Sequence, residues 1–169
     1  MSAGRGLCYH LIRVEIGDVI KQRCGCNQFA THTHLILTKR PERMQAWVSV
    51  HYPVPLPHIF LGTSVEDQQT ADTRIPWLIQ TPAGERFLSV EPLLGPVKLD
   101  LTGIGWVIVG AESGPKRRPM DLAWLEAIAA QCDAEYIPLY VKQDGALRPG
   151  QQGRIPDALW DRKEFPLPF

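Results

Sequence analysis

Five short apolar runs along the chain each end in a cluster of polar or small residues. Each run has the length and the β-branched or aromatic bias of a buried strand. With their polar ends, the runs read LILTKR, IFLGTSVED, RFLSVEP, WVIVGAESG and PLYVKQD. Parallel strands that are covered on both faces give such continuous apolar runs, and their carboxyl ends open onto loops. The pattern therefore predicts an α/β fold in which five strand ends share one rim.

Helical patterns lie between several of these strands. We expect the first strand at 35–39, the second at 58–63, the third at 86–90, the fourth from Trp106 and the fifth at 136–141. Pro41 suits the first position of a helix, and Asp121 is placed to cap another. Ser64 and Asp67 have the spacing of a capping box, for a helix that should end before Pro76.

The strand order leaves two architectures open, an open sheet and part of a barrel. Five strands are too few for a complete eight-stranded β/α barrel. Residues 93–104 have no helical pattern and should be mostly loop. In this organisation 1–31 is an atypical N-terminal segment, 32–143 is the β/α body, and 144–169 is a tail that Trp160, Phe165 and Phe169 anchor to the body.

Composition narrows the class of protein. The 169 residues suit one domain, and 18 basic residues balance 18 acidic ones, so overall charge does not favour nucleic acid or a membrane surface. No apolar run approaches the ~20 residues that span a bilayer, and the N-terminus has no signal-peptide pattern. We therefore expect a cytoplasmic protein with reduced thiols and no membrane contact. The oligomeric state is not indicated.

Candidate functional residues stand at the five strand ends. They are Lys39 and Arg40, Ser64 and Glu66, Glu91, Glu112 and Ser113, and Lys142 and Gln143. Glu91 ends an otherwise apolar strand, where a carboxylate is costly unless a cation or a hydrogen-bond donor meets it. Two interpretations follow, a site for an amino-bearing ligand or a general base, and an internal ion pair that stabilises the rim.

The fourth strand end carries glycines and is followed by basic residues. The run from Gly110 to Gly114 either presents N–H groups to an anion, adenine or ribose, or forms a turn that needs glycine. Lys116, Arg117 and Arg118 either hold a phosphate or lie on a solvated loop.

Metal ligation is not favoured. His32 and His34 alternate like ligands on one face of a strand, but no third ligand stands at a diagnostic spacing. Cys24 and Cys26 are separated by one residue, whereas chelating thiols usually have two or more between them. Cys132 lies on the apolar face of a predicted helix and should belong to the core.

Several long segments of the sequence resemble an uncharacterised phage and prophage family of unknown function, and they occur in the same order as in that family. The matching segments are LTKRPERM, LGTSVEDQQTADTRIP, FLSVEPLLGPV, WVIVGAESGPKRRPM and VKQDGALRPGQQGRIPDALW. Members of that family are similar to radical S-adenosylmethionine enzymes. They have an N-terminal three-cysteine motif followed by a β/α partial barrel, and the three thiolates of such a motif hold a [4Fe–4S] cluster that binds the cofactor.

The resemblance implies an incomplete TIM-like (β/α) partial barrel of about five parallel strands with a loop-rich C-terminal tail. No three of Cys8, Cys24, Cys26 and Cys132 have the spacing of the family motif, and residues 1–31 replace the first two β/α units. We therefore expect a truncated member of the family without the iron–sulfur cluster, unable to perform radical chemistry alone.

By the same resemblance, strand ends acquire expected roles. Those on the cofactor side, facing the methionine, ribose or adenine of S-adenosylmethionine, are Ser64, Glu91, Gly110, Glu112 and Ser113. Those on the substrate side are Lys39, Arg40, Lys142 and Gln143.

Three hypotheses remain open at this point. The chain retains a cofactor or nucleotide pocket of a radical-enzyme-like barrel; or it is a non-enzymatic prophage binding or accessory module; or it is a β/α phosphate-binding enzyme unrelated to radical chemistry. Small molecules and nucleic acid both stay open as partners. Catalytic residues are not assigned.

Overall fold

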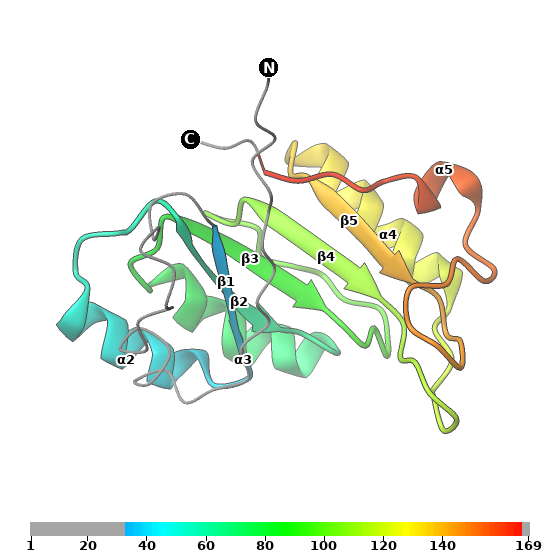
Figure 1. Ribbon diagram of the computed structural model, residues 1–169, viewed down its shortest axis with the longest axis horizontal. Helices are drawn as coiled ribbons and strands as arrows, with labels where there is room; N and C mark the ends of the chain where they lie inside the picture. Colours follow the sequence, from blue (N-terminus) through cyan, green and yellow to red (C-terminus); the bar gives the residue numbers. More distant parts are fainter. Residues whose placement is uncertain (1–32, 167–169) are drawn as a thin grey trace, which may run out of the picture.

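The computed structural model describes residues 33–166, which form a five-stranded sheet and four helices (Figure 1). The strands are β1 (His34–Thr38), β2 (Ile59–Ser64), β3 (Glu85–Val90), β4 (Trp106–Gly110) and β5 (Leu139–Gln143). The helices are α2 (Pro41–His51), α3 (Gln68–Ile79), α4 (Leu122–Ala134) and the short α5 (Asp157–Trp160). The expected α/β class with five parallel strands is confirmed for the described residues.

The sheet runs in the order β1-β2-β3-β4-β5, and each neighbouring pair is parallel. Spatial order therefore equals sequence order. The arrowheads of β3, β4 and β5 point toward the same end of the molecule in Figure 1. All five carboxyl ends consequently lie along one edge, which we call the rim.

Alternation along the strands divides the apolar side chains between the two faces of the sheet. Ile36, Leu61 and Leu88 join one buried cluster, which also contains core residues of α2, α3 and α4. Their neighbours Leu35, Phe60, Phe87 and Trp106 form a second cluster. Because successive side chains of a strand point to opposite faces, α2, α3 and α4 pack on the first face only.

The helices begin where local sequence dictates, with one correction. Pro41 is the first residue of α2, and the side chain of Asp121 accepts a hydrogen bond from Ala123 N at the start of α4, both as expected. The prediction of a capping box at Ser64 and Asp67 is wrong. Asp67 is itself the N-cap and forms the box with Thr70, because β2 continues through Ser64.

A second correction concerns α3, which runs through Pro76 instead of ending before it. Ile75 and Leu78, on either side of the proline, are almost completely buried against the sheet. Packing of this face outweighs the hydrogen bond that proline removes, so tertiary contacts override the local signal.

The last strand also starts later than its apolar run suggests. Tyr136 is 94% exposed with φ +55° and belongs to the turn after α4, and β5 begins only at Leu139. Tyr136 therefore fits the apolar pattern of a strand although it lies outside β5. Residues 93–104 contain no helix or strand, as expected.

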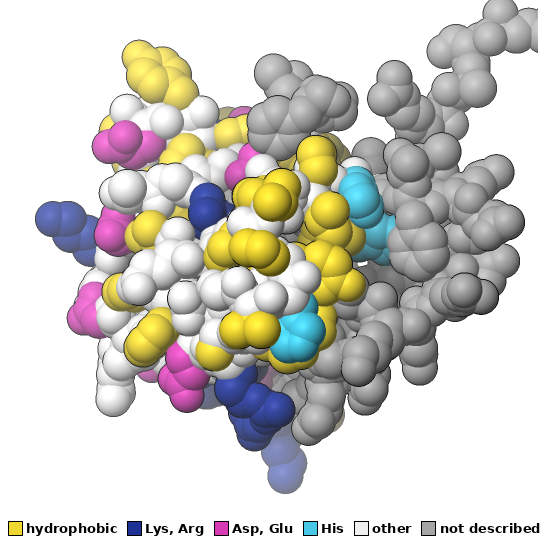
Figure 2. Space-filling model, turned by 90° about the vertical axis from the view of Figure 1, so that its left-hand side faces the viewer, with side chains coloured by type: hydrophobic (Ala, Val, Ile, Leu, Met, Phe, Trp, Pro, Cys, Tyr) yellow, Lys and Arg dark blue, Asp and Glu magenta, His cyan; other side chains and the backbone are white. Residues whose placement is uncertain are grey.

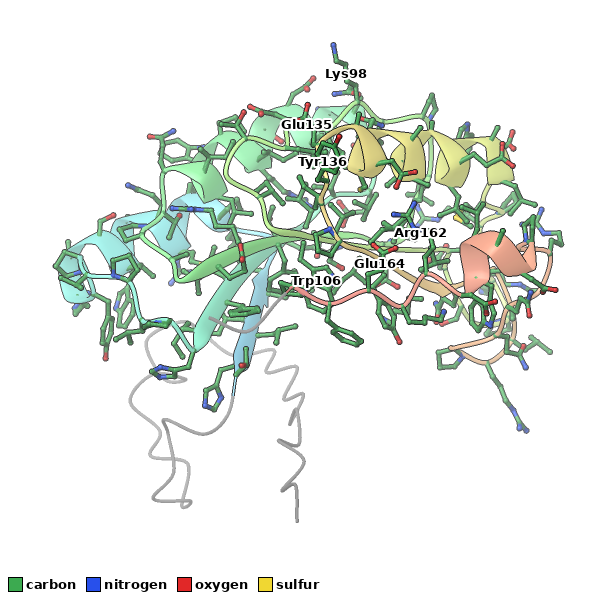
Figure 3. The ribbon with its side chains drawn as sticks, turned by 90° about the horizontal axis from the view of Figure 1, so that it is seen from above. Lys98, Trp106, Glu135, Tyr136, Arg162 and Glu164 are labelled. Carbon is green, nitrogen blue, oxygen red and sulfur yellow. The ribbon has the colours of Figure 1, made fainter. Side chains whose placement is uncertain are left out.

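The tail after β5 wraps around the edge of that strand. Lys163 pairs antiparallel with Tyr140, Val141 N donates to the carbonyl of Arg162, and Glu164 N donates to the carbonyl of Leu139. Trp106 Nε1 donates to the Glu164 carbonyl at 2.9 Å (Figure 3). The backbone groups of the edge strand are thereby paired, which protects it from pairing with another chain.

Two of the three expected aromatic anchors of the tail lie within the described residues. The Phe165 ring lies 5.5 Å from the Trp106 ring and 5.3 Å from the Tyr140 ring. Trp160 packs against the helix-side cluster. The tail therefore contacts both faces of the sheet, while the predictions for Phe169 and for residues 1–31 fall outside the described residues.

Candidate functional site

The rim brings polar side chains from all five strand ends to one edge of the sheet. Their charges are paired, in two cases across long sequence separations. The ion pairs are Lys39 with Glu66, Arg74 with Glu66, Lys142 with Glu91, Arg118 with Glu112, and Arg154 with Asp144. Lys39 with Glu66 and Lys142 with Glu91 join the ends of different strands, so the sheet topology creates these two pairs.

Glu91 lies at the centre of the rim, directly after β3. Its side chain is 16% exposed, and Lys142 Nζ donates to its Oε2 at 3.1 Å. Ser89 Oγ donates weakly to the same oxygen at 3.4 Å. Both hydrogen bonds that this carboxylate accepts from described residues thus use Oε2. The sequence analysis required a cation or a hydrogen-bond donor beside Glu91, and in the structure the cation is Lys142.

The second oxygen of Glu91 lies against Gly110. A Cβ atom at Gly110 would come within 2.8 Å of Oε1 and within 3.3 Å of Gln143 Cγ. Glycine is therefore required for Glu91, Gly110 and Gln143 to sit together at the ends of β3, β4 and β5. Oε1 remains as an acceptor for an N–H or O–H donor from outside the described residues.

Glu66 forms a second cluster at the ends of β1 and β2. Lys39 Nζ lies 2.5 Å from its Oε1, and Arg74 Nη1 lies 2.7 Å from its Oε2. Arg74 also donates to the carbonyl of Ser64 at 2.8 Å. The sequence analysis missed Arg74, because it lies inside α3, and only the packing of α3 on β2 brings it to the rim.

Glu112 and Arg118 form a two-bonded ion pair in the loop after β4. Arg118 Nε lies 2.7 Å from Oε2 and Nη2 lies 3.1 Å from Oε1. These side-chain hydrogen bonds, with one from Arg118 N, lower the pKa of Glu112 to about 2. They also raise the pKa of Arg118, and the charges of Glu112 and Glu66 add to that effect.

Asp144 anchors the loop that follows β5. Its carboxylate accepts two side-chain hydrogen bonds from Arg154, at 2.8 and 2.9 Å, and backbone bonds from Arg154 and Gly145. Burial opposes ionisation of this side chain, but these hydrogen bonds outweigh it and the pKa of Asp144 is lowered. The sequence analysis did not identify this pair, whose role is to hold the loop.

The other predicted rim residues occupy less direct positions. Gln143 is buried and bonds to Ala111 O and Gly150 N, so it joins two rim loops. Ser64 is also buried, whereas Arg40 is exposed and uses its backbone N–H to bond Thr38 Oγ1. Ser113 is partly exposed beside Glu112.

Within residues 33–166, no three histidine, cysteine, aspartate or glutamate side chains are grouped to hold a metal ion. Cys132 is buried on α4, as expected, and burial raises the pKa of its thiol to about 12. Its thiol is therefore protonated at neutral pH, the state that does not ligate metal. His32, Cys8, Cys24 and Cys26 lie outside the described residues.

No helix in the described part of the chain has the length and apolar character that crossing a bilayer requires.

Comparison with protein families gave a match over most of the chain. A family model described as "Protein of unknown function (DUF5131)" matches residues 14–163. The chain belongs to this family. The match spans all five strands of the sheet and every rim residue named above. Searches of the curated proteins and of the solved structures gave no match.

Proposed function

We propose that the rim binds S-adenosylmethionine or a related nucleoside through Glu91, and that the chain is a phage-associated protein similar to radical S-adenosylmethionine enzymes. In this proposal the sheet is an incomplete TIM-like barrel. The observation that carries it is the Glu91 carboxylate, which is mostly buried at the centre of the rim and has one oxygen without a donor from the described residues.

The sheet supports the barrel part of the proposal. In a β/α barrel each strand lies beside the next one in the sequence, and the helices pack on the outer face only. The described residues have the same order, and α2, α3 and α4 share a single cluster on one face of the sheet. Ligands of such folds bind at the carboxyl ends of the strands, where Glu91 lies.

The chemistry of Glu91 favours a ligand with N–H donors. Lys142 neutralises the carboxylate from one side, while Oε1 lies against the bare backbone of Gly110. An α-amino group, a ribose hydroxyl and an adenine amino group all donate to such an oxygen. Glu91 would hold and orient the ligand.

The described residues do not fit the iron–sulfur cluster of radical enzymes. Such a cluster needs three thiolates, whereas the described part of the chain has Cys132 alone, buried and protonated. We therefore assign to these residues the binding of a cofactor or nucleotide and no radical step.

Thermal unfolding with and without ligand tests the proposal. S-adenosylmethionine, adenosine or ATP at 100 times its Kd should stabilise the protein by about 2.7 kcal/mol. Glu91→Gln should abolish this stabilisation, because the neutral amide lacks the negative charge of the carboxylate and has an NH₂ group in place of one acceptor oxygen. Glu135→Gln, at an exposed carboxylate next to Tyr136 (Figure 3), is the matched control and should retain it.

Equal stabilisation of the Glu91→Gln variant, or none of the unaltered protein, would overturn the assignment of Glu91. Reconstitution of the full chain with iron and sulfide under anaerobic conditions addresses the cluster separately. We expect no stable visible absorption band. A stoichiometric cluster would contradict the view that this chain lacks the necessary ligands.

A further inference from the structure

The ion pair of Glu91 and Lys142 differs from the other ion pairs of the rim in how much of its hydrogen-bonding capacity is used. The carboxylates of Glu66, Glu112 and Asp144 each accept hydrogen bonds at both of their oxygens. Glu91 accepts hydrogen bonds from the described residues at Oε2 alone. Among these four carboxylates, Glu91 therefore keeps one oxygen for another donor.

Lys142 has unused capacity of the opposite sign. Its Nζ donates to Glu91 Oε2 at 3.1 Å, which uses one of its three N–H groups. Its side chain is 47% exposed, so the other N–H groups are open to a ligand. A negatively charged acceptor and positively charged donors thus stand side by side, joined by one 3.1 Å contact.

Both side chains stand on the face of the sheet where α2, α3 and α4 do not pack. Phe87 belongs to the second cluster, and Ser89 and Glu91 follow it at intervals of two residues, the repeat of one strand face. The contact of Ser89 Oγ with Glu91 Oε2 agrees with this placement. Tyr140 packs against the same cluster and stands two residues before Lys142. These three helices therefore do not cover the pair.

The two opposite charges disfavour a ligand that carries a single charge. A phosphate beside Lys142 would also meet the Glu91 carboxylate, and a simple amine beside Glu91 would also meet the Lys142 ammonium group. Like charges at such short separations repel. A ligand with both charges on neighbouring groups meets each charge with its opposite. An α-amino acid has this form, because its ammonium and carboxylate groups are attached to the same carbon.

We propose that Glu91 and Lys142 bind the α-amino acid end of a ligand. Glu91 Oε1 accepts from the ammonium group of the ligand, and the remaining N–H groups of Lys142 Nζ donate to its carboxylate. Gly110 completes the site, since a Cβ atom there would come within 2.8 Å of Oε1. The ion pair already holds both side chains in place, so less side-chain entropy is lost on binding.

This inference rests on the proposed function, because it names the part of the ligand that lies at Glu91. A ribose hydroxyl, an adenine amino group and an α-amino group all donate to a carboxylate oxygen. Of these, only the α-amino group brings a carboxylate that Lys142 can bind. S-adenosylmethionine has such an end, whereas adenosine and ATP do not.

Calorimetric titration of the full chain with four probes tests the inference. S-adenosylmethionine has both groups, its decarboxylated form has the amino group alone, 5′-methylthioadenosine has neither, and L-methionine has both without a nucleoside. We expect the decarboxylated form to bind about tenfold more weakly than S-adenosylmethionine, the effect of one hydrogen bond between charged groups.

The Lys142→Met variant separates contact with the ligand from a purely structural role. It should weaken binding of S-adenosylmethionine about tenfold without weakening that of the decarboxylated form, which has no carboxylate for Lys142. Lys98→Met is the matched control, at an exposed lysine on the side of the sheet that carries α3 and α4 (Figure 3). It should change either affinity less than about twofold. Circular dichroism confirms that each variant is folded.

Two results would overturn the inference. Equal weakening of both forms of S-adenosylmethionine in Lys142→Met would show that Lys142 only holds Glu91 in place. Equal affinity of the unaltered protein for the two forms would show that the carboxylate is not recognised.

The remaining probes distinguish failure here from failure of the proposed function. Loss of 5′-methylthioadenosine binding in Glu91→Gln, with no effect of the ligand carboxylate, would retain nucleoside binding at Glu91 and overturn the inference. Binding of L-methionine that depends on Lys142, with no binding of 5′-methylthioadenosine, would support the inference and remove the nucleoside from the proposed function. No binding of any probe to the unaltered protein would overturn both.

Discussion

The two ends of the sheet differ in how their charged side chains are paired. At the rim, Glu66, Glu91, Glu112 and Asp144 each pair with a cation. At the opposite end, the Arg86 side chain donates to the backbone carbonyls of Leu78 and Thr81, and Arg162 pairs with Asp133 and Glu164 beside the start of β5. Both ends thus contain ion pairs among the described residues, but only the rim places a carboxylate oxygen, Glu91 Oε1, where none of these residues donates to it.

Apolar surface also differs between the ends. Figure 2 views the molecule from the end where β3, β4 and β5 begin, and hydrophobic and histidine side chains gather over much of its described surface. Val50 and Val54, in and after the last turn of α2, are both 74% exposed. Charge at a strand end is costly unless it is paired, and at the rim each of Glu66, Glu91, Glu112 and Asp144 has a cationic partner.

The largest effect should come from the buried pair after β5. Asp144→Ala should lower the free energy of unfolding by about 3 kcal/mol, because it leaves the N–H groups of Gly145 and Arg154 without their acceptor. Urea unfolding followed by tryptophan fluorescence measures the loss. Asp161→Ala, at an exposed aspartate, is the control. Equal stability of the two variants would show that Asp144 does not anchor the rim loop.

A smaller loss is expected where the tail covers the sheet. Phe165→Ala should cost about 1 kcal/mol, because the ring packs against Trp106 and Tyr140 while 41% of it stays exposed. Leu147→Ala, at a residue 67% exposed in the loop after β5, should be nearly neutral. The same unfolding measurement compares the variants. A larger loss of stability in Leu147→Ala than in Phe165→Ala would show that the packing of Phe165 contributes less to stability than Leu147 in the loop after β5.

The Glu112–Arg118 pair should give a distinct pH signature. The folded pKa of Glu112, about 2, lies below the ordinary 4.5. The contribution of this pair to the free energy of unfolding is therefore complete above the pKa that Glu112 has in the unfolded chain. It is lost as pH falls through the pKa of Glu112 in the folded protein. Carboxyl NMR should show a midpoint near 2, and Arg118→Gln should return it toward 4.5. An unaltered midpoint in Arg118→Gln would show that Arg118 does not cause the low pKa of Glu112.

The smallest effect is expected at the amino end. Val50→Ser and Val54→Ser should each change stability by less than about 0.5 kcal/mol, since both side chains are already exposed to water. Chemical denaturation tests this directly. A loss above about 1 kcal/mol would mean that these valines are covered in solution, and the contrast between the two ends would disappear.

Several elements followed from local sequence because their causes are local. The apolar runs of β1 to β4, the first helical residue Pro41 and the cap at Asp121 depend on residues within one or two turns. That Glu91 and Lys142 stand at one rim also followed from parallel strand order, whereas the structure decided that these two residues pair. Errors arose at Pro76 and Tyr136, where packing or turn geometry outweighed the local pattern.

By itself, the sequence determined the parallel α/β class, the five strand ends and the polar residues that stand there. Only the tertiary structure decided which of these residues meet. Arg74 reaches Glu66 from inside a helix, Arg154 returns to Asp144 across a loop, and Gly110 lets Glu91 approach the backbone. The reason is physical. Strand and helix signals arise from neighbouring residues, whereas a binding site arises from contacts between segments that the chain brings together only when it folds.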